Sequence, residues 1–197
     1  MFPYVQKSPR RPRAALELGI PGAYAWSVAW WRRKSDGEGE KTRTYKGPGY
    51  SFEYPGSWRV RRGVKVASEA DYETLSHVLV SPGEPPNSVS LQVMRYAFSI
   101  SEENIAEHKE RLAAEVRASL EGAQGDITAD QKPVTVGGLP GFSYEGTFPM
   151  EGTEVRARFT QVHKGDTLYS FTSQFAPEDA DEVLRGGALI ERSFRLA

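Results

Sequence analysis

The sequence of 197 residues contains no cysteine and only three histidines. Without cysteine, the chain forms no disulfide, thiolate metal site or iron–sulfur cluster, and it has no cysteine nucleophile. A hydrophobic content of 39% is enough for one ordinary domain with a core, together with a tail. The composition therefore argues against wholesale disorder and against a scaffold held together by disulfides.

The net charge is also small, at −1, but the charges are unevenly distributed along the chain. Residues 1–34 carry seven basic side chains and a single acidic one, Glu17, which gives a formal charge of +6. Residues 35–197 carry 18 basic and 25 acidic side chains, which gives −7. Such asymmetry is typical of a tail with its own environment or partner, so the chain reads as a basic leader followed by an acidic body.

The leader combines two basic clusters with a mostly apolar stretch at residues 14–31. This stretch is shorter than the roughly 20 apolar residues of a spanning helix, and Glu17 and Pro21 interrupt it. Tryptophan beside arginine is typical of a membrane–water interface. The residues that we expect to contact a membrane or partner are Trp26, Trp30, Trp31, Arg32 and Arg33. A disordered leader, a degraded export signal and a part of the folded domain are the open alternatives.

Composition divides the chain into the leader at residues 1–34, a polar linker at residues 35–45 and a folded domain at residues 46–197. In the domain, apolar and polar residues alternate as they do in half-buried strands. The expected strands are residues 50–54, 58–60, 72–80, 89–96, 132–136, 141–148, 155–160 and 168–176. Residues 164–166, Lys-Gly-Asp, predict a tight hairpin between the last two strands.

Two helices are expected among these strands. Residues 99–121 place Ser99 and Glu102 at the spacing of a capping box and put apolar residues on one face. Pro177 begins the second helix, and the two glycines at residues 186–187 are expected to weaken or bend it, at about 1 kcal/mol each relative to alanine. Runs of strands with two helices predict an α+β fold in which helices cover a mostly antiparallel sheet.

Several short motifs follow one another along the domain. The domain opens with GPGYSFEYPGSWRV, in which an aromatic strand leads to the Tyr54-Pro55 turn and then to Trp58. The segment VGGLPGFSYEG precedes two hairpin strands, and the chain ends in ALIERSFRL. Over residues 45–197 this order resembles the PsbP-like superfamily, which includes Mog1-type proteins and actinobacterial lipoproteins. The resemblance implies an α-β-α sandwich and binding roles rather than chemistry, without the lipid-attachment cysteine of many bacterial members.

No P-loop, nucleophile elbow or metalloprotease motif occurs, so no catalytic residue, cofactor or metal ligand is predicted. His77, His108 and His163 lack the short ligand spacing of ordinary metal sites and are interpreted as surface or edge residues. The leading hypothesis is a non-enzymatic binding or accessory protein that is bacterial and membrane-associated or exported. We expect a protein partner and no nucleic-acid partner. The alternatives are a small-ligand carrier or hydrolase-like enzyme with an aromatic cleft, and a soluble cytoplasmic interaction module.

Basic residues on the predicted strands usually lie on a solvated face. If several of them share one side of the sheet, they form a surface that suits a partner of opposite charge. The candidates for such a partner surface are Arg59, Arg61, Arg62, Arg156 and Arg158.

Overall fold

The computed structural model describes residues 41–63, 72–83, 85–100, 104–122 and 124–197. The predicted leader therefore lies outside the described residues, as does Glu102 of the predicted capping box. The same holds for the five leader residues that are expected to contact a membrane or partner, namely Trp26, Trp30, Trp31, Arg32 and Arg33.

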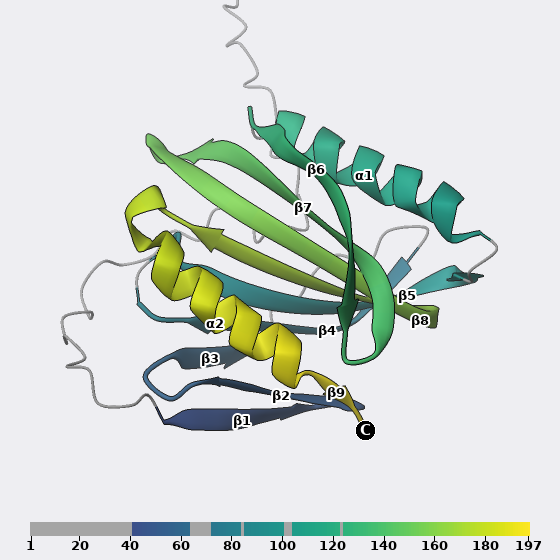
Figure 1. Ribbon diagram of the computed structural model, residues 1–197, viewed down its shortest axis with the longest axis horizontal. Coiled ribbons are helices and arrows are strands. Elements are labelled where there is room, and N and C mark those ends of the chain that lie inside the picture. The colour runs from purple at the N-terminus through teal and green to yellow at the C-terminus, as the bar shows by residue number, and fades with distance from the viewer. Residues whose placement is uncertain (1–40, 64–71, 84, 101–103, 123) are drawn as a thin grey trace, which may run out of the picture.

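Two antiparallel sheets and two α-helices make up the described part of the chain (Figure 1). The smaller sheet has the order β1-β2-β9, with β1 (Thr42–Gly47), β2 (Tyr50–Pro55) and β9 (Arg195–Leu196). The larger sheet has the order β3-β4-β5-β8-β7-β6. Its strands are β3 (Arg59–Arg62), β4 (Tyr72–Ser81), β5 (Ser88–Ile100), β8 (Thr153–Phe175), β7 (Leu139–Met150) and β6 (Asp126–Val136). Every pairing is antiparallel, which confirms the predicted α+β class.

The start of the smaller sheet differs from the sequence interpretation. Residues 42–45, which the composition assigns to the linker, belong to β1 and pair with β2. The ring of Tyr45 favours this pairing because it is buried and stacks on Phe52 of β2, with centroids 5.0 Å apart. A single buried aromatic in a polar run gives no periodic signal, so this strand is fixed by its partner.

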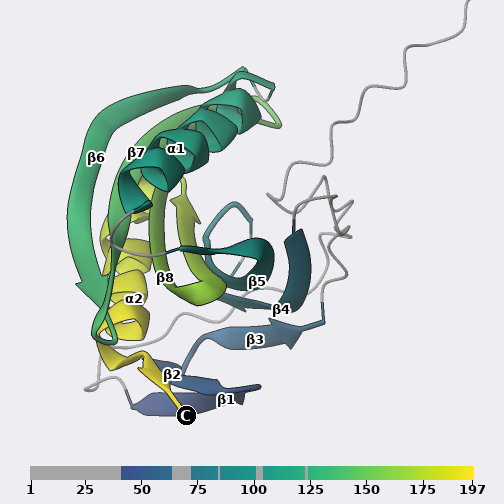
Figure 2. The same ribbon diagram turned by 90° about the vertical axis from the view of Figure 1, so that its right-hand side faces the viewer.

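Strand β8 turns back on itself. Its first half pairs with β7, from Thr153 opposite Met150 to Val162 opposite Gly141. Its second half pairs with β5, and Figures 1 and 2 show the ribbon reversing between the two halves. Gly165 stands at the reversal with a φ of 59°, which glycine adopts without steric cost. The hairpin predicted at residues 164–166 is confirmed.

The two helices cover opposite faces of the larger sheet. In α1 (Ile105–Gly122), Leu120 packs with Phe159 of β8, whereas Val183 of α2 (Ala180–Ser193) packs in the cluster that contains Val162 of β8. Residues 159 and 162 point to opposite faces because side chains alternate along a strand. A short 3-10 helix, η1 (Pro177–Asp179), leads into α2. No helix among the described residues is long and apolar enough to cross a membrane.

The largest core lies between α2, one face of the larger sheet and the smaller sheet. Phe194, at the end of α2, is fully buried and meets the ring of Phe171 edge-on, with centroids 5.2 Å apart. Phe52 and Trp58, from the aromatic motif near the start of the domain, are buried in the same cluster. These aromatic side chains therefore fill the core.

Glycines 186 and 187 do not interrupt α2, contrary to the expectation that they weaken or bend it. Both are buried and face the sheet side of the helix. A Cβ on Gly186 would overlap the indole of Trp58, and a Cβ on Gly187 would lie 2.6 Å from Oγ of Ser173. The missing side chains let the helix approach Trp58 and β8 closely, so packing overrides the low helix propensity of glycine.

Candidate functional site

A cleft of about 690 Å³ lies where the end of α2 approaches the β6–β7 hairpin. Figures 1 and 2 both show these two segments side by side. The cleft is a shallow depression that is widely open to solvent. The residues that line it are Val134, Thr135, Val136, Gly137, Gly138, Arg158, Ala188, Glu191, Arg192 and Arg195. We call this feature the arginine cleft.

The arginine cleft carries a formal excess of two positive charges. Arg158, Arg192 and Arg195 contribute three guanidinium groups, and Glu191 contributes one carboxylate. A guanidinium is planar, stays protonated and presents a fork of N–H donors that matches a carboxylate. The electrostatics of the cleft therefore favour an acidic ligand.

Arg158 and Glu191 lie next to each other in the lining of the cleft. The Nη2 atom of Arg158 lies 3.9 Å from Oε2 of Glu191, and the two side chains are 34% and 16% exposed. This separation allows an ion pair but is too long for a hydrogen bond. Water screens such a pair, so its contribution to stability is about 0–1 kcal/mol.

Arg195 has a structural task at the end of α2. Its Nη1 donates to the main-chain carbonyl oxygens of Arg192 at 2.9 Å and Phe194 at 2.6 Å. These bonds satisfy carbonyl groups that a helix leaves without partners at its C-terminus. The exposed side chain of Arg192, in contrast, makes no hydrogen bond or ion pair with another described residue.

The β6–β7 turn forms the other wall of the cleft. Gly137 and Gly138 have φ values of 60° and 81°, as the favoured two-residue hairpin turns require. A Cβ on Gly137 would lie 2.8 Å from the ring of Phe194, so a larger residue would push the turn away from α2. Glycine at position 137 thus allows the β6–β7 turn to lie close to the end of α2.

Strand β6 is the last strand of the larger sheet, and no strand of the described chain pairs with its outer edge. Val136 and Leu139 flank the two-residue turn and form a hydrogen-bonded pair across β6 and β7. Because such pairs alternate along an antiparallel ladder, the main-chain N–H and C=O groups of Thr135 point to the outer edge. These main-chain groups therefore lie on the side of β6 that faces away from β7 and from Arg158 of β8.

The structure does not gather the five predicted arginines on one surface. Arg59, Arg61 and Arg62 lie on β3, which β4 and β5 separate from β8. Arg62 stacks over the ring of Tyr45 at 5.0 Å, and Arg156 pairs with Glu154 at 3.8 Å. Arg158 alone among the five lines the arginine cleft.

Sequence reasoning missed Arg192 and Arg195. Basic residues at the end of a helix ordinarily complement the helix dipole, so the run ERSFR gave no separate signal. Their approach to Arg158 depends on how α2 docks against β8, which has no local pattern.

Two of the three histidines are buried, so their interpretation as surface or edge residues is wrong. His77 is 5% exposed and His163 is 8% exposed. His77 stands opposite Gln92 in the β4–β5 register, on a polar part of the sheet that is nonetheless buried. Burial lowers the pKa of His77, and burial together with the nearby charge of His108 lowers the pKa of His163. The described residues contain no group of three or more metal-ligating side chains.

No protein-family model and no curated protein sequence matches the chain. Among solved structures, the cyanobacterial PsbP (CyanoP) of Synechocystis sp. is similar at 15% identity and a TM-score of 0.55, over 85% of this chain and 98% of that one. The likeness shows the fold: the chain has the PsbP-like α+β fold that the motifs implied. A structure from Bacteroides thetaiotaomicron has 10% identity and a TM-score of 0.48, over 78% of this chain and 48% of that one. LpqN, involved in cell envelope biogenesis of Mycobacterium tuberculosis, has 11% identity and a TM-score of 0.41, over 73% and 86%.

Proposed function

We propose that this protein is a non-enzymatic binding or accessory protein whose arginine cleft receives an acidic segment of a protein partner. The observation that carries the proposal is the convergence of Arg158, Arg192 and Arg195 around a cleft with one carboxylate. Arginine holds a carboxylate well but does not exchange a proton near neutral pH. The cleft is therefore suited to binding an acidic group rather than to acid–base catalysis.

We favour a polypeptide over a small free anion because β6, the edge strand of the larger sheet, borders the cleft. An extended segment placed beside β6 would bond to the outward N–H and C=O groups of Thr135, as in recognition by strand addition. Acidic side chains of the segment that extend over β6 would enter the cleft, which Arg158 and Arg192 line. An aromatic ligand carrier is less well supported, because the described lining of the cleft contains no aromatic side chain.

We also propose that the leader, residues 1–34, contacts a membrane surface. Its tryptophans and arginines suit the membrane–water interface, so the leader would hold the protein at a membrane surface, in a membrane-associated or exported setting. The residues proposed for this contact are Trp26, Trp30, Trp31, Arg32 and Arg33.

Peptide binding tests the cleft. The full-length protein is titrated into a labelled peptide of aspartate and glutamate and, in parallel, into the matching peptide of asparagine and glutamine, and binding is followed by fluorescence anisotropy. We expect binding of the acidic peptide alone, weakening as salt screens the charges. Arg192→Gln should weaken that binding by about fivefold or more, the equivalent of about 1 kcal/mol.

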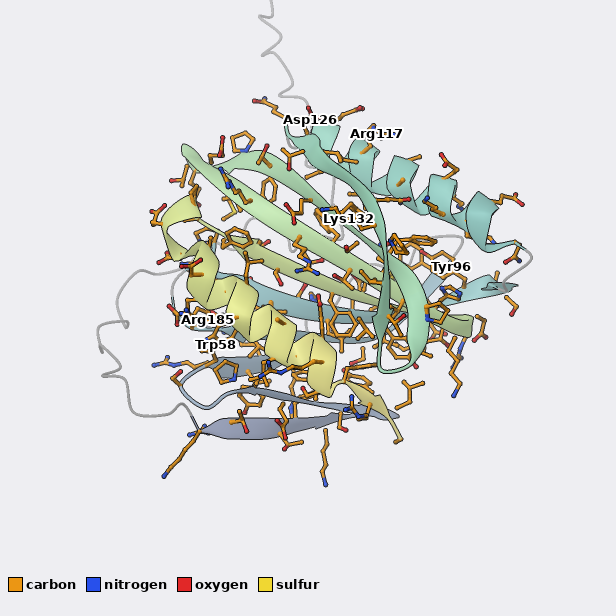
Figure 3. All side chains as sticks on the ribbon, viewed as in Figure 1. Trp58, Tyr96, Arg117, Asp126, Lys132 and Arg185 are labelled. Carbon is orange, nitrogen blue, oxygen red and sulfur yellow. The ribbon has the colours of Figure 1, made fainter. Side chains whose placement is uncertain are left out.

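Arg185→Gln is the matched control for this test. Arg185 is an exposed residue of α2 that does not line the cleft, and Figure 3 shows its position on the helix. The control removes the same charge from the same helix, so its affinity should stay close to that of the unchanged protein. Equal binding of both peptides, or an equal loss in Arg185→Gln and Arg192→Gln, would refute the proposed site.

A further inference from the structure

One acidic residue, Glu191, is found among the described residues that line the arginine cleft. Its carboxylate lies opposite the Arg158 guanidinium, with 3.9 Å between the nearest nitrogen and oxygen. The protein therefore already places one of its own carboxylates beside the arginine that an acidic ligand would seek.

The geometry of the pair leaves Arg158 able to change its partner. At 3.9 Å the two groups attract each other through charge but share no hydrogen bond. The main chain of Glu191 is fixed in the last turn of α2, where its carbonyl oxygen accepts the N–H of Phe194 at 3.3 Å. A ligand carboxylate that formed two direct N–H···O bonds to Arg158 would make the stronger contact.

We infer that Glu191 is an internal competitor for the ligand site: an aspartate, glutamate or chain-terminal carboxylate of an extended acidic segment replaces Glu191 as the counter-ion of Arg158. The inference rests on the proposed function, since it concerns the same cleft and the same class of ligand. Glu191 thereby weakens binding and selects for segments whose carboxylate reaches Arg158 directly.

If Glu191 supported binding instead of competing with the ligand, its removal would have the opposite effect on affinity. If Glu191 instead held Arg158 in the orientation that binds the ligand, removal of its charge would weaken binding. If Glu191 competes, removal of its charge strengthens binding and raises the formal excess of the cleft from two positive charges to three. A single neutral substitution therefore separates the two roles.

The experiment compares Glu191→Gln with the unchanged full-length protein in the titration with the acidic peptide. We expect Glu191→Gln to bind about three to ten times more tightly. In a protein that also carries Arg158→Gln, the substitution at residue 191 should change affinity by less than about twofold, because its target is gone. Glu191→Asp, which withdraws the carboxylate, should give an intermediate gain and serves as the second variant if Glu191→Gln folds poorly.

Glu182→Gln is the matched control, because Glu182 is an exposed residue of the same helix that does not line the cleft. An equal gain in Glu182→Gln would show a general effect of net charge and would overturn the inference. Weaker or unchanged binding by Glu191→Gln would also overturn it, while binding by the unchanged protein would leave the proposed function standing. If neither protein binds the acidic peptide, both proposals fail.

Discussion

Gly186 of α2 packs directly against the indole ring of Trp58, the residue that precedes β3. Figure 3 shows Trp58 beside the helix, and its side chain is buried at 3% exposure. The neighbouring Gly187 lies over Ser173 of β8. Two glycines within a helix cost about 1 kcal/mol each in propensity, and here the close approach of α2 to the sheet offsets that cost.

Gly186→Ala should therefore destabilise the protein, although alanine is the better helix former. The overlap with Trp58 forces side chains or the helix to shift, and overpacking of this kind costs about 1–3 kcal/mol. Urea denaturation would measure the loss in the free energy of unfolding.

Trp58→Phe provides the background that tests the cause of that loss. It removes ring atoms that a Cβ at residue 186 would meet, and the indole N–H has no hydrogen-bond partner among the described residues. The penalty of Gly186→Ala should be smaller in this background. A stabilising effect of Gly186→Ala in the natural background would contradict the packing argument.

Substitution of Arg195 should lower the stability of the protein more than substitution of Arg192. Arg195→Gln removes a donor to two carbonyl oxygens at the end of α2, so we expect a loss of about 1 kcal/mol in the free energy of unfolding. Arg192→Gln should change it by less than about 0.5 kcal/mol, since the exposed Arg192 side chain bonds to no described residue. Thermal denaturation of the two variants checks this, and equal losses would show that the two arginines do not differ in role.

Stability should fall on acidification because of His77. Burial lowers its pKa below the ordinary value of about 6.5, so below that pH the unfolded state binds more protons than the folded state. The free energy of unfolding then decreases as the pH falls, and His163 contributes with the same sign. His77→Gln should reduce the change in urea midpoint between about pH 7.5 and pH 5. A variant whose midpoint falls as steeply as that of the unchanged protein would rule out His77 as a source.

Deletion of residues 1–34 should abolish membrane association. The proposed anchor contains three tryptophans next to two arginines, and the removed segment carries a formal charge of +6. Flotation with vesicles that contain anionic lipid would compare the full-length chain with the shortened one. Recovery of the full-length protein in the soluble fraction alone would contradict the anchor.

Local sequence patterns predicted much of the fold. The alternation along residues 168–176 and the Lys-Gly-Asp turn before it predicted both halves of β8, because period and turn chemistry are properties of short segments. The signal failed where a strand has few periodic residues, as in β1, or is very short, as in β9. These strands exist because β2 pairs with them.

The candidate site was predicted much less well. Of the five arginines that the sequence suggested on strands, Arg158 lines the arginine cleft, and its neighbours there, Arg192 and Arg195, come from the end of the chain. Sequence spacing carries no information about how α2 docks on β8, which sets this convergence.

The sequence by itself determined that the chain has no cysteine chemistry, that a basic leader precedes an acidic body, and that strands and two helices form an α+β domain. Composition and short-range periodicity were enough for these conclusions. Tertiary structure alone decided that Gly186 serves close packing, that His77 is buried, and that Arg158 meets Glu191 at the cleft. Each of these is a contact between residues far apart in the chain, set by strand register and helix docking rather than by any local preference.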